Sequence, residues 1–286
     1  MKVIERSVQE IGKSLFVSLP KQWADNIKLT KQSKLKMFIE DNGTLFIAPF
    51  ENLKNRNKNC EIKYDLNFKR RFFKVYFENP ESISVLIKQP LTSKERKDLS
   101  EFLNYFMNIQ IIDETKEKIV IKIFTINELS IEECAKRMHF LSLNLFDNIL
   151  ENKSKSTQEI RDNMTRFYYM LVMQVRRFLE EGKYAEKNQI SLIRAMDLRM
   201  VAEKIQRIGE SLSEINLLNN ESKQLIKNVE DYYTRTFRYF TNNDFDKASE
   251  LWDEGKKLLE KCEKKNLDLN IKNVIRFTKE IGMLVR

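Results

Sequence analysis

The sequence predicts a multidomain α+β protein with a β-rich N-terminal module, a small α/β unit and a long helical C-terminal half. Three observations predict this class. Apolar residues alternate with polar ones along short segments before residue 125, and they recur every three or four residues from Ser130 onward. The chain also holds only 6 Gly and 4 Pro among 286 residues, which is typical of a helix-rich protein.

Residues 1–50 are predicted to form strand, strand, short helix, strand and strand. Gly12 breaks the chain after the first strand, and Pro20 suits the first turn of a helix, where its missing N–H costs nothing. Asp41-Asn42-Gly43 is a strong signal for a tight hairpin turn. The pattern predicts strands at 2–8, 14–19, 34–40 and 44–48 and a helix at 21–27. So few residues cannot bury a core alone, and we therefore expect two copies to pair.

The order of residues in this module is moderately specific. A basic residue, Arg6, precedes the run Gly12-Lys13-Ser14-Leu15-Phe16-Val17-Ser18-Leu19-Pro20, and the basic loop Lys28 to Lys34 follows the short helix. Across residues 3 to 49 this order resembles the AbrB/MazE/SpoVT swapped-hairpin family.

The resemblance implies a homodimeric barrel of interleaved hairpins that binds DNA. Carried over by position, the basic contacts would be Arg6, Lys13 and Lys21. Ser7 and Ser14 are expected to add neutral phosphate contacts.

The charge distribution points to the same end of the chain. Residues 1–75 hold 16 Lys and Arg against 8 Asp and Glu, whereas the other 211 residues hold 35 against 34. A local basic excess is the electrostatic signature of a polyanion-binding protein. The +9 net charge therefore favours DNA binding by the N-terminal region.

One motif in the same region is misleading. Ile11-Gly12-Lys13-Ser14 resembles the end of a phosphate-binding P-loop, but Ser7 stands where that motif needs a glycine. A strand pattern also follows, where the motif needs a helix. We expect no nucleotide site here.

The middle of the chain is predicted to be a linker, 51–60, and a small α/β connector, 61–128. Phe68 to Phe77 is interpreted as a strand with a basic entry, Lys69-Arg70-Arg71, which could contact nucleic acid while the aromatics form core. A capped helix is expected over 92–106, between a strand at 82–87 and strands at 108–113 and 118–124. With no catalytic grouping, the connector is interpreted as a spacer or a ligand-sensing insert.

Residues 129–286 are predicted to form a bundle of two three-helix groups. In the third helix, Leu198, Val201, Ile205, Ile208, Leu212 and Ile215 are spaced as the seam of an antiparallel bundle. The expected helices cover 130–151, 157–181, 189–218, 222–241, 243–264 and 270–286.

Two motifs of the third helix carry a second resemblance. Asp197-Leu198-Arg199-Met200-Val201 and Ile205-Gln206-Arg207-Ile208-Gly209-Glu210 resemble the signatures of PhoU-like phosphate regulators. That family uses acidic residues of the second motif to hold metal ions, and Glu210 is the only matched acid. The simpler interpretation is a solvated helix face on which Arg199 pairs with Glu203. We expect no metal site and no cofactor.

Other residues exclude whole classes of function. His139 is the only histidine, so a histidine triad or a multi-histidine metal site is excluded within one chain. Cys60, Cys134 and Cys262 are far apart and show no metal-binding spacing. The charged N-terminus and the lack of a long apolar run indicate a cytoplasmic protein without membrane insertion.

Together these patterns predict a non-enzymatic, homodimeric transcriptional regulator that binds DNA and is linked to phosphate uptake or signalling. The alternative is a PhoU-like adaptor that modulates a phosphate transporter or kinase through protein contacts. A metal-dependent enzyme is the third interpretation.

Overall fold

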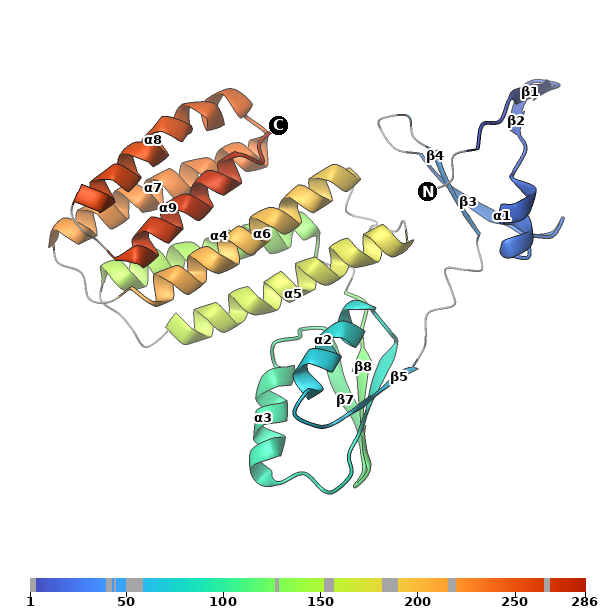
Figure 1. The fold of residues 1–286 in the computed structure, drawn as a ribbon, viewed down its shortest axis with the longest axis horizontal. Coiled ribbons are helices and arrows are strands. Elements are labelled where there is room, and N and C mark those ends of the chain that lie inside the picture. The colour runs from blue at the N-terminus through green and yellow to red at the C-terminus, as the bar shows by residue number, and fades with distance from the viewer. Residues whose placement is uncertain are drawn as a thin grey trace. The chain divides into compact units, whose positions relative to one another are not determined.

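The structure is a computed structural model that describes residues 4–39, 43, 45–49, 59–126, 129–151, 157–181, 190–215, 220–264 and 268–286. The chain separates into two compact units, Met1–Arg56 and Asn57–Arg286. The described residues are mixed α+β and mostly helical, as the sequence predicts (Figure 1). None of the described helices is both long enough and apolar enough to cross a membrane.

The first unit consists of two antiparallel hairpins and a short helix. Strands β1 (Val8–Ile11) and β2 (Ser14–Val17) pair with each other, and β3 (Leu35–Ile39) pairs with β4 (Leu45–Pro49). Helix α1 (Lys21–Asn26) follows Pro20 as expected. Within the described part of the chain, the two hairpins form separate two-stranded sheets.

The first strand was placed wrongly by the sequence pattern. Residues 4–7 are not in a strand, and β1 begins at Val8, where the predicted strand ends. The cause is the turn: Gly12 and Lys13 form a two-residue connection, and β2 has only four residues to offer as partners. The ladder therefore runs from Val8 opposite Val17 to Ile11 opposite Ser14. The predicted turn residues Asp41 and Asn42 lie outside the described residues.

The second unit begins with a four-stranded sheet in the order β5-β6-β8-β7. Its strands are β5 (Asn59–Lys63), β6 (Ser82–Leu86), β7 (Ile109–Glu114) and β8 (Lys118–Ile123). Strand β5 runs parallel to β6, and the other pairs are antiparallel. The sequence analysis did not identify β5, because an alternation of only five residues, Asn59 to Lys63, is too short to separate from the linker.

Two helices, α2 (Phe68–Phe77) and α3 (Ser93–Leu103), pack on one face of this sheet (Figure 1). The α2 segment was predicted as a strand, and that prediction is wrong. Its buried residues are Phe68, Phe72 and Tyr76, four apart, so they lie on one side of a helix. The expectation that its aromatics form core is confirmed, since Phe72 is fully buried and packs edge-on against Phe102.

All six helices predicted for the C-terminal half are confirmed. Ser130 and Glu133 form a capping box that fixes the start of the first one, and Ser191 and Asp268 cap two others. They are α4 (Ile131–Leu150), α5 (Thr157–Glu181), α6 (Leu192–Ser213), α7 (Asn220–Asn242), α8 (Phe245–Lys264) and α9 (Leu269–Gly282).

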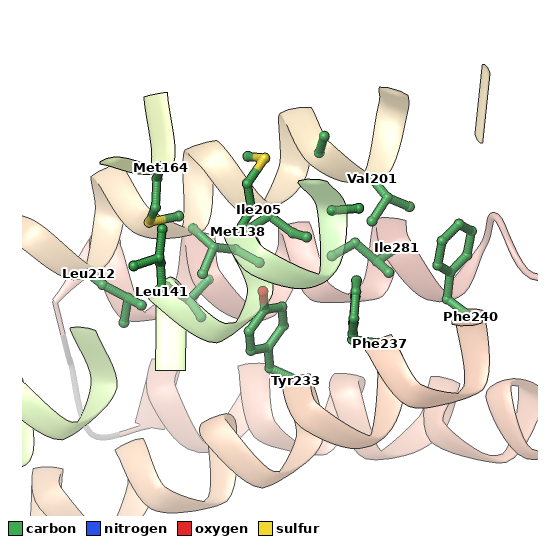
Figure 2. Close-up of a cluster of buried hydrophobic side chains, with 14 of the residues drawn as sticks. Met138, Leu141, Met164, Val201, Ile205, Leu212, Tyr233, Phe237, Phe240 and Ile281 are labelled. Carbon is green, nitrogen blue, oxygen red and sulfur yellow. The ribbon is translucent and has the colours of Figure 1, made fainter. Parts of the chain in front are cut away.

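These helices pack as two groups of three that share one core. Helices α4, α5 and α6 contact one another, as do α7, α8 and α9, while α6 packs on α9 and α4 on α7. Figure 2 shows buried side chains of α4, α5, α6, α7 and α9 meeting in the middle of the bundle. Among them are Met138, Leu141, Met164, Val201, Ile205, Tyr233 and Phe237. The seam predicted for the third helix is buried from Leu198 to Leu212.

The α/β part rests on the outer side of α5. Tyr169 of α5 stacks on Phe106 with ring centroids 5.4 Å apart, and Met173 belongs to the α/β core. Arg166 Nε donates to the Asn104 carbonyl oxygen at 2.7 Å, and the Tyr105 hydroxyl donates to Asp162 Oδ1 at 3.2 Å. The α/β part and the helical bundle are therefore held together by both apolar and polar contacts.

Candidate nucleic-acid interface

The β1–β2 hairpin presents Lys13 at its tip. Gly12 has φ of +68°, a left-handed conformation that glycine adopts without strain, and it lets the chain reverse in two residues. Ser14 then starts β2 opposite Ile11. Both Lys13 and Ser14 are exposed, so each can meet a ligand at the end of the hairpin.

Three further predicted contacts flank the hairpin. Arg6 and Ser7 come just before β1, and Lys21 is the first residue of α1, directly after Pro20. All three side chains are exposed. Val8, the first residue of β1, is paired with Val17, the last residue of β2, so Arg6 and Ser7 directly precede the open end of the hairpin.

A basic loop lies after α1. The Lys28 residue has φ of +54° and its N–H donates to the Asp25 carbonyl oxygen at 3.1 Å, which ends the helix. Thr30 and Ser33 then close a compact turn: the Thr30 N–H donates to Ser33 Oγ at 2.9 Å, and the Ser33 N–H donates back to the Thr30 carbonyl oxygen at 3.0 Å.

This turn exposes three lysines that the sequence analysis did not assign as contacts. Lys28, Lys31 and Lys34 are all exposed, at regular spacing along a loop that its own hydrogen bonds hold in shape. In the sequence, the only signal for these three lysines was their regular spacing of three residues. Their charge alone could not show that all three lie in the loop, outside the helix and the strands.

Six cations of this unit have no carboxylate partner among the described residues. Arg6, Lys13 and Lys21, like the three loop lysines, form no salt bridge with any carboxylate of the described residues. An exposed cation without a carboxylate partner keeps its full charge for a phosphate, and each such contact releases counterions from DNA. The arrangement suits binding to a polyanion backbone.

The apolar residues of this unit are also exposed. No described side chain between residues 4 and 49 is buried. In the β3–β4 hairpin, Met37 faces Ile47 and Ile39 faces Leu45 on one side of the sheet, and Ile39 is 82% exposed. An apolar face this open is typical of a surface that another chain covers.

The other basic segment singled out by sequence lies apart in the chain, on α2. Arg71 is paired with Asp65 at 2.7 Å, and Lys69 Nζ lies 5.5 Å from the centre of the Phe102 ring. These two contacts hold α2 to its surroundings. Only Arg70 of the three basic residues is left without such a partner among the residues that the structure describes.

Two neighbours of Glu210 on its helix face are engaged by other side chains. Glu203 pairs with Arg207 at 2.9 Å, so the expected pairing of Glu203 with Arg199 is wrong. Gln206 Nε2 donates to Thr165 Oγ1 at 3.0 Å. Within the described ranges no three acidic, histidine or cysteine side chains gather as a metal would need.

The single histidine has a structural environment. His139 stacks on Phe237 with ring centroids 4.0 Å apart and an angle of 14° between the rings. Burial lowers the pKa of His139 to about 4. The three cysteines are all free.

Comparisons of the chain with protein-family models, with curated proteins and with solved structures found no match.

Proposed function

We propose that this protein is a DNA-binding transcriptional regulator that acts as a homodimer through residues 1–50. Arg6, Lys13 and Lys21 contact the phosphate backbone and groove edges, and Ser7 and Ser14 add neutral contacts. The structure adds Lys28, Lys31 and Lys34 as candidates for the same surface. The bundle sets the spacing of the two N-terminal modules or transmits a signal to them.

One observation carries this proposal: a small unit displays unpaired cations although it buries no described side chain of its own. A module without a core needs a second copy to be stable. Pairing two copies also doubles the cations into a two-fold arrangement, which is how dimeric regulators match DNA half-sites. The remaining chain is nearly neutral, so it contributes little attraction to DNA.

The link to phosphate uptake rests on the resemblance of Asp197–Val201 and Ile205–Glu210 to PhoU-like motifs. The packing supports a bundle built from two similar halves, since α4 with α7 and α6 with α9 are the pairs that join the two groups. The metal-binding role of that family is not proposed for this chain, because the described residues bring no group of three acidic, histidine or cysteine side chains together.

The test is DNA binding measured by fluorescence anisotropy across a salt series, with duplexes drawn from the protein's own promoter. We expect affinity to fall steeply with salt, with a slope of about −0.9 for each phosphate neutralised. The double variant R6A/K13A should bind at least tenfold more weakly and give a shallower slope. Identical affinity and slope for this variant and the wild type would refute the assignment.

A matched control removes the same charge elsewhere. Lys257 and Lys261 are exposed on α8, outside the proposed surface, and K257A/K261A lowers the net charge by the same amount. We expect this control to bind DNA as the wild type does. If both double variants weakened binding equally, general charge and not a defined surface would hold the DNA.

The second candidate function is the adaptor that modulates a phosphate transporter or kinase. One observation favours it: Ile193, Met196 and Met200 of α6 are exposed and share one helix face at spacings of three and four. Crosslinking in cells distinguishes the two functions. Recovery of a transporter or kinase by the wild type but not by M196E/M200E, without recovery of DNA, would support the adaptor.

A further inference from the structure

A cavity of about 370 Å³ lies in the second three-helix group, between α7, α8 and α9. Its walls are mostly apolar, and three of its large side chains are also exposed: Phe245, Trp252 and Met283. The size and the lining are those of a pocket for a small molecule. Nothing in the proposed DNA-binding function requires such a cavity.

The cavity contains a single charged group, Lys279. Its Nζ lies 4.2 Å from the centre of the Trp252 ring, so the ammonium is placed over an aromatic face at the pocket wall. Lys279 forms no salt bridge with any carboxylate of the described chain. An unpaired cation against apolar walls is complementary to an anion with an apolar body.

Glycines shape the wall around Lys279. A Cβ at Gly255 would lie 2.5 Å from the Tyr232 hydroxyl and 2.8 Å from Lys279 Cγ, so only glycine lets these two side chains cross α8. Gly282 lines the cavity itself, and a Cβ there would meet only Thr236 Cγ2, at 3.5 Å. The space beside Gly282 is therefore open, while the position of the lysine stem is fixed by close packing.

Two carboxylates of this group of helices, Glu254 and Glu280, already have cation partners. Glu254 receives two hydrogen bonds from Arg235, at 3.0 and 2.6 Å, and Glu280 pairs with Lys204 at 2.6 Å. Neither acid appears in the cavity lining. A ligand carboxylate would therefore not have to displace a described carboxylate of the protein from Lys279.

We propose that this cavity binds a small monocarboxylate with an aromatic or aliphatic body, with Lys279 as the partner of its carboxylate. The apolar part of the ligand lies against Phe245, Leu251, Trp252 and Met283. The site is independent of the N-terminal module, so it makes the bundle a receptor for an acidic metabolite whether or not the protein binds DNA.

The experiment uses 4-phenylbutanoate as the probe and its neutral amide as the matched compound. In the full-length Trp23→Phe protein, Trp252 is the remaining tryptophan, and its fluorescence reports occupancy of the cavity. We expect the acid to bind at least tenfold more tightly than the amide. Lys279→Met, which keeps the apolar stem, should abolish this difference and leave amide binding unchanged.

Two variants test the location. Gly282→Leu places a side chain in the open space, and Ser249→Phe fills the cavity from its exposed rim without adding a tryptophan, so each should abolish binding of both compounds. Lys257→Met, which removes an exposed lysine outside the lining, should bind both compounds as the parent does. Equal binding of the acid by Lys279→Met and the parent, or unaltered binding by a folded Ser249→Phe protein, would overturn the proposal.

Discussion

Arg286 holds the carboxylate of Asp197 through two contacts, with Nε 3.0 Å from Oδ2 and Nη2 3.1 Å from Oδ1. The Asp197 side chain is only 7% exposed, whereas that of Arg286 is 57% exposed. A planar guanidinium matches a carboxylate in this two-point geometry. This ion pair links Arg286, which follows α9, to the first half of α6, where one of the two PhoU-like motifs lies.

Replacement of Arg286 by Ala should destabilise the protein by about 1–3 kcal/mol, because it leaves a buried carboxylate without its charged donor. Urea denaturation measures this loss. Asp197→Asn in the same background should recover part of it, since a buried amide costs less than a buried charge. Arg276→Ala is the control, because Arg276 is exposed and, among the described residues, forms only a long hydrogen bond to Asn273, at 3.5 Å. Equal losses for both arginine variants would contradict this role.

Replacement of Gly255 and of Gly282 by Ala should affect the stability of the protein differently. Within a helix, Gly→Ala gains about 1 kcal/mol from helix propensity. At Gly255 this gain is outweighed, because the new Cβ would lie 2.5 Å from the buried Tyr232 hydroxyl, and overpacking costs typically about 1–3 kcal/mol. At Gly282 the closest atom is 3.5 Å away, so the gain should persist. Thermal denaturation should show a lower Tm for Gly255→Ala and an unchanged or higher Tm for Gly282→Ala.

His139 should make the stability of the bundle depend on pH. Burial lowers its pKa to about 4, and its Nδ1 has no hydrogen-bond partner in the structure. In the unfolded chain the group protonates near its ordinary pKa of about 6.5. The unfolded state therefore binds more protons between these values, so the stabilisation is complete above pH 6.5 and is lost as the pH falls toward 4.

The expected loss between pH 7.5 and pH 5 is about 2 kcal/mol. The variant His139→Phe keeps the stack on Phe237 and removes the titration, and it should show little change over the same interval. Denaturant titrations at the two pH values give the change in the free energy of unfolding for the wild type and for the variant. A wild-type curve as flat as that of the variant would show that His139 is not the titrating group.

The helices could be read from the sequence because their signals are local. Ser130 with Glu133, and Thr92 with Glu95, form complete capping boxes, and the apolar period of α6 runs unbroken from Leu198 to Leu212. The prediction for α2 was wrong because its composition is typical of a strand, with aromatics at five of ten positions and a β-branched valine. Its helical state depends on Phe102 and Phe106, which pack against Phe72 from a distant part of the chain.

Of the two candidate sites, one could be predicted from local sequence signals and the other could not. Arg6, Lys13 and Lys21 could be singled out because charge and order in the sequence need no knowledge of distant partners, and the structure places each of the three in an exposed position. The Lys279 cavity could not be identified, since Lys279 and Trp252 belong to different helices and their spacing in sequence has no local meaning. The sequence of one chain could not show how the first unit buries its apolar residues either, because no described side chain between residues 4 and 49 is buried.

The exposed face of the β3–β4 hairpin gives the most direct test of pairing. Ile39 is 82% exposed opposite Leu45, and full burial of such a side chain contributes roughly 1.5–3 kcal/mol. Ile39→Glu places a charge on this face in each copy, so the dimer dissociation constant should rise at least tenfold, since about 1.4 kcal/mol corresponds to a factor of ten. Sedimentation equilibrium measures the change.

The control for Ile39→Glu is Gln32→Glu, which adds the same charge in the exposed loop and should leave the dimer intact. Because the two-fold arrangement of Arg6 and Lys13 requires the dimer, Ile39→Glu should also weaken DNA binding, although it removes no cation. A variant that stays dimeric at the same concentration would show that the second copy covers a different surface.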